Sequence, residues 1–284
     1  MRLRSLDALR GLAVVALVLA TRGPQELAHA LPLLLFGVGA ELAYALARFA
    51  GTDPVLRRPR LPWARVAARA AALLALAVAS RALERGALGD AAPSVVLLRV
   101  AVCYAGAAAV VVQLGPLVQW GILVALLALA RVLRAFDAVP DEALSTLAGV
   151  ALTILGGRAG ATLWGAVASR EHAVRMAVHA PLWIALALGL SPWLPVDARP
   201  WSATYVALAT GGSLALFAAL YALVELRNVS LRPLEVVGRH ALVVYAGAAL
   251  CAHFVDSLAF AAAMLALWYG VAELCERRAL RFAV

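Results

Sequence analysis

Long apolar segments, separated by short polar ones, make up almost the whole chain. A helix that crosses a bilayer needs about 20 mostly apolar residues, with a range of about 17–25. Ten segments approach or reach this length: residues 6–20, 31–49, 63–80, 93–114, 117–133, 144–164, 176–190, 203–226, 241–255 and 258–275. We therefore expect an all-α fold, a polytopic transmembrane helix bundle of about ten spans that forms a single domain over residues 1–284.

Composition excludes a water-soluble domain. Hydrophobic residues make up 64% of the chain and charged residues 14%, with a mean hydropathy of +0.90. Soluble domains have about 45–50% apolar and about 25% charged residues. The basic start followed by an apolar segment could be a signal peptide, but no small-residue cleavage site follows it. We expect the first helix to be retained.

The charged residues indicate how the chain sits in a membrane. All 25 basic residues are arginine, and with 16 acidic residues they give a net charge of +9. The arginines stand singly or in small groups between apolar segments, which is typical of loop ends facing anionic lipid headgroups and not of a nucleic-acid interface. We expect a multi-pass protein of the cell (inner or plasma) membrane, with the lipid bilayer and no nucleic acid as its partner.

Arginine positions also predict orientation, because cytoplasmic loops carry the excess of positive charge. With the amino terminus in the cytoplasm, the cytoplasmic segments hold Arg2, Arg4, Arg57, Arg58, Arg60, Arg65, Arg170, Arg175, Arg227, Arg232, Arg277, Arg278 and Arg281. The opposite side holds Arg22, Arg81, Arg85, Arg134 and Arg199. Both termini are therefore expected to be cytoplasmic.

Ionisable residues inside the apolar segments are candidates for function, because a charge in a bilayer is costly. Asp7 and Arg10 lie three residues apart and could pair on one helix face, as part of a site or as an anchor at the interface. Arg99 lies about six residues into the fourth segment and needs a carboxylate, a phosphate or water. A structural pair with Glu41 or Glu142 competes with ligand binding as the explanation of Arg99.

Histidines are the candidates for a catalytic base. The five are His29, His172, His179, His240 and His253, and none has the spacing of a metal site. Cys103, Cys251 and Cys275 lie in or beside apolar segments and are interpreted as buried hydrophobic residues, so no metal is expected. His29 is expected in the external loop before Pro32, where a base could reach both an external acceptor and a membrane-embedded donor. A single interfacial histidine could equally be merely solvated.

Several segments resemble one family of membrane acyltransferases. The opening RSLDALRGLAVVALVLA, followed by LPLLLFGVGAELA, is similar to the start of the heparan-α-glucosaminide N-acetyltransferase-like family. Four later segments follow in that family's order: LLRVAVCY, PDEALSTLAGVALTILGGRAG, DARPWSATYVALATGGSLALFAALYALVEL and PLEVVGRHALVVYAGAAL. The resemblance implies transfer of an acyl group from a cytoplasmic acyl-CoA, typically acetyl-CoA as co-substrate, to a sugar or other cell-envelope acceptor.

Residue by residue, the resemblance places a catalytic histidine after the first helix and binding residues further on. The external loop here is only TRGPQELAHA and lacks the family's His-x-x-Trp, Leu98 stands for its Gln, and His240 stands for its Asn. His29 and His240 are therefore the two candidate bases. Candidates for binding the donor or the acceptor are Asp7, Arg10, Arg99, Glu142, Trp201 and Arg239.

Two further expectations follow. We expect the first, second, fourth and ninth segments to pack around a polar cavity in which Arg99 and Arg239 form the donor site, because these segments carry the buried charges. The shortened loop also favours a second hypothesis, a relative that no longer transfers acyl groups and serves as a transporter, lipid-binding or partner protein. A homo-oligomer is compatible with both hypotheses.

Overall fold

The computed structural model describes residues 3–20, 24–47, 63–83, 93–163, 169–198, 201–253 and 258–278. These residues form helices and short connections and no β-strand, apart from one isolated bridge between Ala198 and Trp201. The helices are α1 (Arg4–Leu19), α2 (Pro24–Ala47), α3 (Trp63–Leu83), α4 (Pro93–Gln113), α5 (Pro116–Ala135), α6 (Asp141–Ala161), α7 (Arg170–Leu190), α8 (Ala203–Tyr221) with its π-helical extension η1 (Ala222–Leu226), α9 (Arg232–Arg239), α10 (Ala241–His253) and α11 (Leu258–Arg277). The all-α prediction is confirmed for the described part of the chain.

Six helices in the described ranges are long and apolar enough to cross a membrane, namely α4, α5, α6, α7, α8 with η1, and α11. Each of the ten predicted segments coincides with a helix, and α9 is an additional short helix. Helix α2 begins at Pro24, so its helical backbone includes His29 and the loop predicted there is wrong. The His29 side chain lies outside the described residues.

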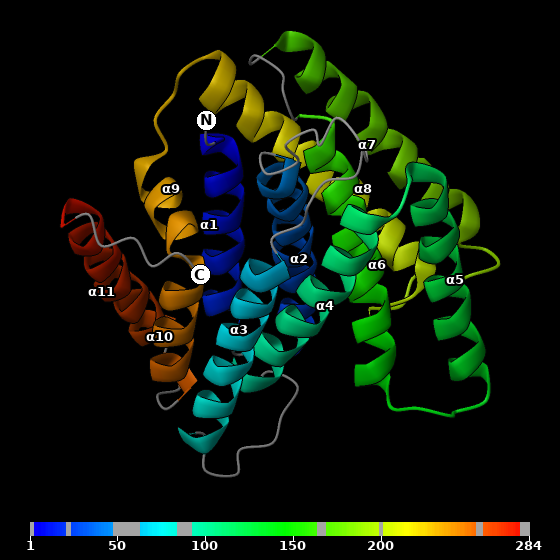
Figure 1. The fold of residues 1–284 in the computed structure, drawn as a ribbon, viewed down its shortest axis with the longest axis horizontal. Coiled ribbons are helices and arrows are strands. Elements are labelled where there is room, and N and C mark those ends of the chain that lie inside the picture. Colours follow the sequence, from blue (N-terminus) through cyan, green and yellow to red (C-terminus); the bar gives the residue numbers. More distant parts are fainter. Residues whose placement is uncertain are drawn as a thin grey trace.

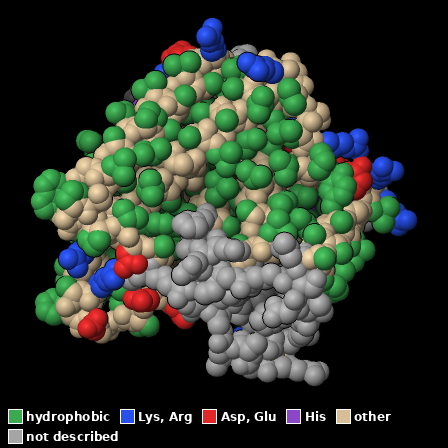
Figure 2. Space-filling model, turned by 180° about the vertical axis from the view of Figure 1, so that it is seen from behind, with side chains coloured by type: hydrophobic (Ala, Val, Ile, Leu, Met, Phe, Trp, Pro, Cys, Tyr) green, Lys and Arg blue, Asp and Glu red, His purple; other side chains and the backbone are tan. Residues whose placement is uncertain are grey.

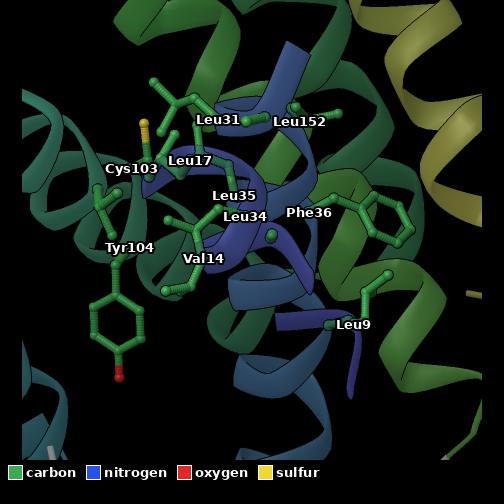
Figure 3. Close-up of a cluster of buried hydrophobic side chains, with 14 of the residues drawn as sticks. Leu9, Val14, Leu17, Leu31, Leu34, Leu35, Phe36, Cys103, Tyr104 and Leu152 are labelled. Atoms are coloured by element: carbon green, nitrogen blue, oxygen red, sulfur yellow. The ribbon is translucent and has the colours of Figure 1, made fainter. Parts of the chain in front are cut away.

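Helices α1 and α2 lie at the centre of the molecule, between α9–α11 on one side and α4–α8 on the other (Figure 1). Their apolar faces form the core together with α4 and α6. Figure 3 shows this cluster, with Leu9, Val14, Leu17, Leu31, Leu34, Leu35, Phe36, Cys103 and Leu152 gathered where the four helices meet and the Tyr104 ring extending away from them. The polar end of Tyr104 is thus available to a neighbouring site.

Small residues bring α2 and α6 into close parallel contact. Gly156 and Gly160 of α6 lie directly against the backbone of Phe36 and Ala40 of α2, so a Cβ at either glycine would overlap a carbonyl group. Such small-xxx-small spacing lets membrane helices approach closely without a hydrophobic driving force between them. The contact fixes α2, and with it Glu41, relative to the α4–α8 side of the bundle.

Many large hydrophobic side chains are exposed on the outer surface. Figure 2 shows hydrophobic side chains across the face seen from behind, with arginine and acidic side chains gathered at its margins. Only 11% of the apolar segment of α5 and 22% of that of α7 is buried inside the protein. Large side chains such as Leu117, Val124 and Leu182 are more than half exposed. An exposed apolar band of this extent suits a surface that faces lipid.

Candidate functional site

The charged residues that the sequence places inside α1 and α2 meet in one ion-pair network. Arg10 Nη2 donates to Asp7 Oδ1 at 3.1 Å and to the carbonyl oxygen of Gly238 at 2.7 Å. Its Nη1 contacts the carboxylate of Glu41 on α2. The side chains of Arg10 and Asp7 are 9% and 5% exposed, so the guanidinium is neutralised inside the protein. The predicted pairing of Asp7 with Arg10 is confirmed.

Arg239, in the last turn of α9, continues the network. Its Nε lies 3.6 Å from Asp7 Oδ2, its Nη2 lies 3.5 Å from Glu235 Oε2, and its Nη1 contacts Glu276 of α11. Glu235 in turn accepts hydrogen bonds from Arg4 Nε at 3.0 Å and Arg4 Nη2 at 2.8 Å. Four helices, α1, α2, α9 and α11, are therefore joined by charges at one end of the bundle.

Helix α9 can lie this close to α1 because glycine occurs at both contact points. A Cβ on Gly238 would overlap the carbonyl oxygen of Asp7, and one on Gly11 would overlap that of Leu234. On the buried face of α9, Val236 and Val237 pack into the core beside Glu235. The close approach places the Gly238 carbonyl next to Arg10 and delivers Arg239 to Asp7.

A second carboxylate ties α1 to the end of α8. Glu225, in the π-helical turn η1, accepts hydrogen bonds from the Ser5 N–H at 3.0 Å and from the Ser5 hydroxyl at 3.2 Å. A carboxylate at the first turn of a helix satisfies an N–H that has no partner within the helix and complements the helix dipole. The amino-terminal end of α1 is thus held in a fixed position.

A cavity of about 70 Å³ adjoins this network. It lies among α1, α2, α3, α4, α9 and α10, and its polar lining is Arg10, Glu41, Arg69, Tyr104, Arg239 and His240. A single water needs about 10–15 Å³ of such volume, so the space suits a few waters or one small chemical group. The first, second, fourth and ninth predicted segments thus do border one cavity, which apolar residues line together with these polar ones.

His240 is placed at this cavity by the junction of α9 and α10. It directly follows Arg239, the last residue of α9. Its N–H donates to the carbonyl of Val236 at 3.2 Å, and its own carbonyl accepts from the Val244 N–H at 3.0 Å. The residue is 9% exposed. His240 is therefore nearly buried and lines the cavity, and its role as a base stays a prediction.

Arg69 of α3 differs from the other arginines of the cavity in its polar partners. It lines the cavity and is half-buried, and it forms no hydrogen bond or ion pair with the part of the chain that the structure describes. The neighbouring Arg10 and Arg239 are already paired with carboxylates. Arg69 is therefore the guanidinium best placed to accept an anionic group inside the cavity.

The structure does not bring Arg99 to this cavity. Val100 and Tyr104 of α4 line it, whereas Arg99 faces another direction and its guanidinium carbon lies 6.0 Å from the centre of the Trp201 ring. The predicted donor site shared by Arg99 and Arg239 is therefore wrong. Glu41 contacts Arg10. The pairing of Arg99 with Glu41 or with Glu142 stays a prediction.

Glu142 and Trp201 do not line the cavity either. Glu142 is exposed in the first turn of α6, and Trp201 is buried before α8 against Tyr205. His253 ends α10, and like His29 its side chain is outside the described residues. The roles of Glu142, Trp201 and His29 stay predictions. In the described ranges, no three His, Cys, Asp or Glu side chains come close enough to hold a metal ion.

Comparison with known proteins adds no family to this description. No protein-family model matches the chain, and no curated protein matches it. The similarity to membrane acyltransferases consequently depends on the sequence segments described above.

Proposed function

We propose that the protein is a ten-span integral membrane protein of the cell membrane with both termini in the cytoplasm. The ten spans are α1 to α8, with η1 completing α8, together with α10 and α11. The start of α1, the end of α2 and the end of α11 meet in the ion-pair network. Alternating spans require these three ends to lie on one membrane side, and the arginine distribution makes that side cytoplasmic.

Within this bundle, we propose that the cavity beside His240 transfers an acyl group, with acetyl-CoA as the co-substrate and a sugar or other envelope molecule as acceptor. The observation that carries the proposal is the grouping of His240 with Arg69 at one intramembrane cavity on the cytoplasmic side. A cavity of about 70 Å³ suits the acyl end of the donor and leaves its nucleotide outside.

In the proposed reaction His240 takes a proton from the amine or hydroxyl of the acceptor. The acceptor atom forms a bond to the acyl carbon, the carbonyl becomes an oxyanion, and the carbon–sulfur bond of the thioester then breaks. The departing thiolate receives the proton. Arg69 holds the oxyanion, because a fixed guanidinium stabilises charge that develops in the transition state. A general base typically contributes about 10²–10⁴ in rate.

The structure gives Arg10, Asp7 and Arg239 a different role from the one expected for donor binding. In the ion-pair network their charges are balanced by protein groups, so binding a donor phosphate would require an existing pair to break. We propose that they hold α1, α2, α9 and α11 in the arrangement that positions His240.

A second candidate function is binding or transport without acyl transfer. It is favoured because carboxylates of the protein already neutralise the arginines of the ion-pair network. Arg4, Arg10 and Arg239 face the carboxylates of Asp7, Glu41, Glu235 and Glu276, so the described residues give the network no excess positive charge. In a transporter, breaking and re-forming these ion pairs would open and close the cytoplasmic side of the bundle.

Labelled acetyl-CoA and a panel of amino sugars, added to the purified protein in nanodiscs, test the acyltransferase proposal. We expect transfer by the parent and a loss of about 10²–10⁴ in turnover for His240→Ala. His179→Ala is the matched control because His179 is exposed on α7, away from the cavity. His29→Ala tests the rival base. Full activity of His240→Ala together with loss in His29→Ala would assign the base to His29.

A further inference from the structure

A second cavity, of about 180 Å³, lies between α5, α6, α7 and α8, apart from the ion-pair network. Its lining includes two tryptophans, Trp120 and Trp183, whose rings stack with their centres 6.1 Å apart. Arg158 of α6 and Arg175 of α7 also line it. Positive charges beside aromatic rings favour an anionic occupant with an apolar part.

Arg158 is held in place without a carboxylate. Its Nη1 donates to Gln119 Oε1 and to the carbonyl oxygen of Pro116, each at 3.3 Å, and its guanidinium carbon lies 4.7 Å from the centre of the Trp120 ring. In the described residues these are the partners of its side chain. A guanidinium has five N–H donors, so Nε and Nη2 keep their capacity to bind an acceptor.

Gln119 fixes the orientation of the Arg158 guanidinium. Its Nε2 donates to the carbonyl oxygens of Val111 at 3.0 Å and Leu114 at 2.8 Å, which fixes the amide so that Oε1 faces Arg158. The residue is 8% exposed. The orientation of Arg158 is therefore set by a buried polar side chain and an aromatic ring, and its remaining donors meet no carboxylate in the described ranges.

The cavity lies where a lipid headgroup would lie. Arg158 is in the last turn of α6, and Trp120 and Arg175 are in the second turns of α5 and α7, so the ends of three membrane helices meet there. Helices α5 and α7 are also among the least buried candidate spans, at 11% and 22%. Tryptophan is enriched at this depth, and basic pockets between helices bind anionic headgroups on the cytoplasmic side.

We propose that this cavity binds the phosphate of an anionic phospholipid through Arg158, with Arg175 adding positive charge and the Trp120–Trp183 pair contacting the apolar part of the lipid. Arg175 is paired with exposed Glu171 at 2.7 Å, so its contribution is the smaller one. Helix α5 packs mainly against α6, and α7 packs mainly against α8, so the lipid would bridge these two helix pairs.

Titration of the purified protein in neutral detergent, followed by tryptophan fluorescence, tests this proposal. The probes are dioctanoyl-phosphatidylglycerol, dioctanoyl-phosphatidylcholine and sodium phosphate. We expect saturable binding of the phosphatidylglycerol, at least tenfold weaker binding of the zwitterionic lipid, and no saturable change with phosphate. Equal affinity for the two lipids would overturn the proposal, and equal binding of phosphate and phosphatidylglycerol would replace the lipid with a soluble anion.

Variants locate the site. Arg158→Gln should weaken phosphatidylglycerol binding at least tenfold. Arg158→Lys should weaken it less, because lysine keeps the positive charge and loses only the paired N–H donors of the guanidinium. Arg134→Gln is the matched control, since Arg134 also ends a helix but is paired with Asp197 at 2.7 Å. Unchanged affinity in Arg158→Gln would overturn the assignment. If that variant does not purify as a monodisperse protein, Arg158→Lys and the comparison of lipids on the parent decide the question.

Discussion

Replacing Arg10 with methionine should destabilise the bundle strongly, because Arg10 is the ion-pair partner of Glu41 among the described residues. The substitution keeps a long side chain but removes the polar contacts to Asp7, Glu41 and the Gly238 carbonyl. Removing one partner of a buried ion pair costs about 3–5 kcal/mol. Glu41 is 26% exposed and Asp7 keeps Arg239 at 3.6 Å, so we expect the lower end, about 3 kcal/mol.

The double substitution Arg10→Met with Glu41→Gln separates the charge effect from packing. Most of the loss comes from an uncompensated carboxylate, so the neutral glutamine should restore about 2 kcal/mol of the free energy of unfolding. Equilibrium unfolding in mixed micelles of a mild detergent and SDS measures both values. Arg134→Met is the control, because the half-exposed Arg134–Asp197 pair is worth about 0–1 kcal/mol. A loss below about 1 kcal/mol for Arg10→Met, or no recovery in the double variant, would refute the reasoning.

Two further predictions concern packing and topology. Gly160→Ala should cost about 1–3 kcal/mol of the free energy of unfolding in the same assay, because the new Cβ overlaps the Ala40 backbone. Gly212→Ala, where nothing lies within 4 Å, should be neutral or stabilise by up to about 1 kcal/mol, and equal effects of the two changes would contradict the helix contact. In a background without the native cysteines, a membrane-impermeant maleimide should label Ala138→Cys and not Asn228→Cys in intact cells. The reverse pattern would contradict the proposed orientation.

Local patterns predicted the helices well. The apolar segments mark where the backbone must satisfy its own hydrogen bonds, and each of them coincides with a helix. Asp7 and Arg10 could be paired from sequence because residues three apart share a helix face. Helix α9 was not predicted as a separate element, because its eight residues precede the ninth apolar segment directly and have no apolar length of their own.

Long-range partners could not be predicted in the same way. Nothing in the sequence connects Arg10 to Glu41, or Arg239 to Glu276, since these pairs depend on how helices pack. Arg99 was expected at the donor site because it lies inside a span, but which face of α4 it occupies depends on contacts made by Val100 and Tyr104. The role of Arg69 was not predicted, because only the assembled cavity shows which arginine meets no carboxylate among the described residues.

Binding of the donor alone tests the proposed function most directly, because it needs no knowledge of the acceptor. Equilibrium binding of tritiated acetyl-CoA to the parent in nanodiscs should be saturable. In the bound donor the same Arg69 guanidinium would donate a hydrogen bond to the thioester carbonyl. Arg69→Gln should therefore weaken binding about tenfold, which corresponds to about 1.4 kcal/mol and to the loss of one hydrogen bond to a charged group. Arg131 is an exposed arginine on α5, so Arg131→Gln should bind acetyl-CoA with the affinity of the parent. Absence of saturable binding by the parent, or equal affinity in Arg69→Gln, would contradict a donor site at the His240 cavity.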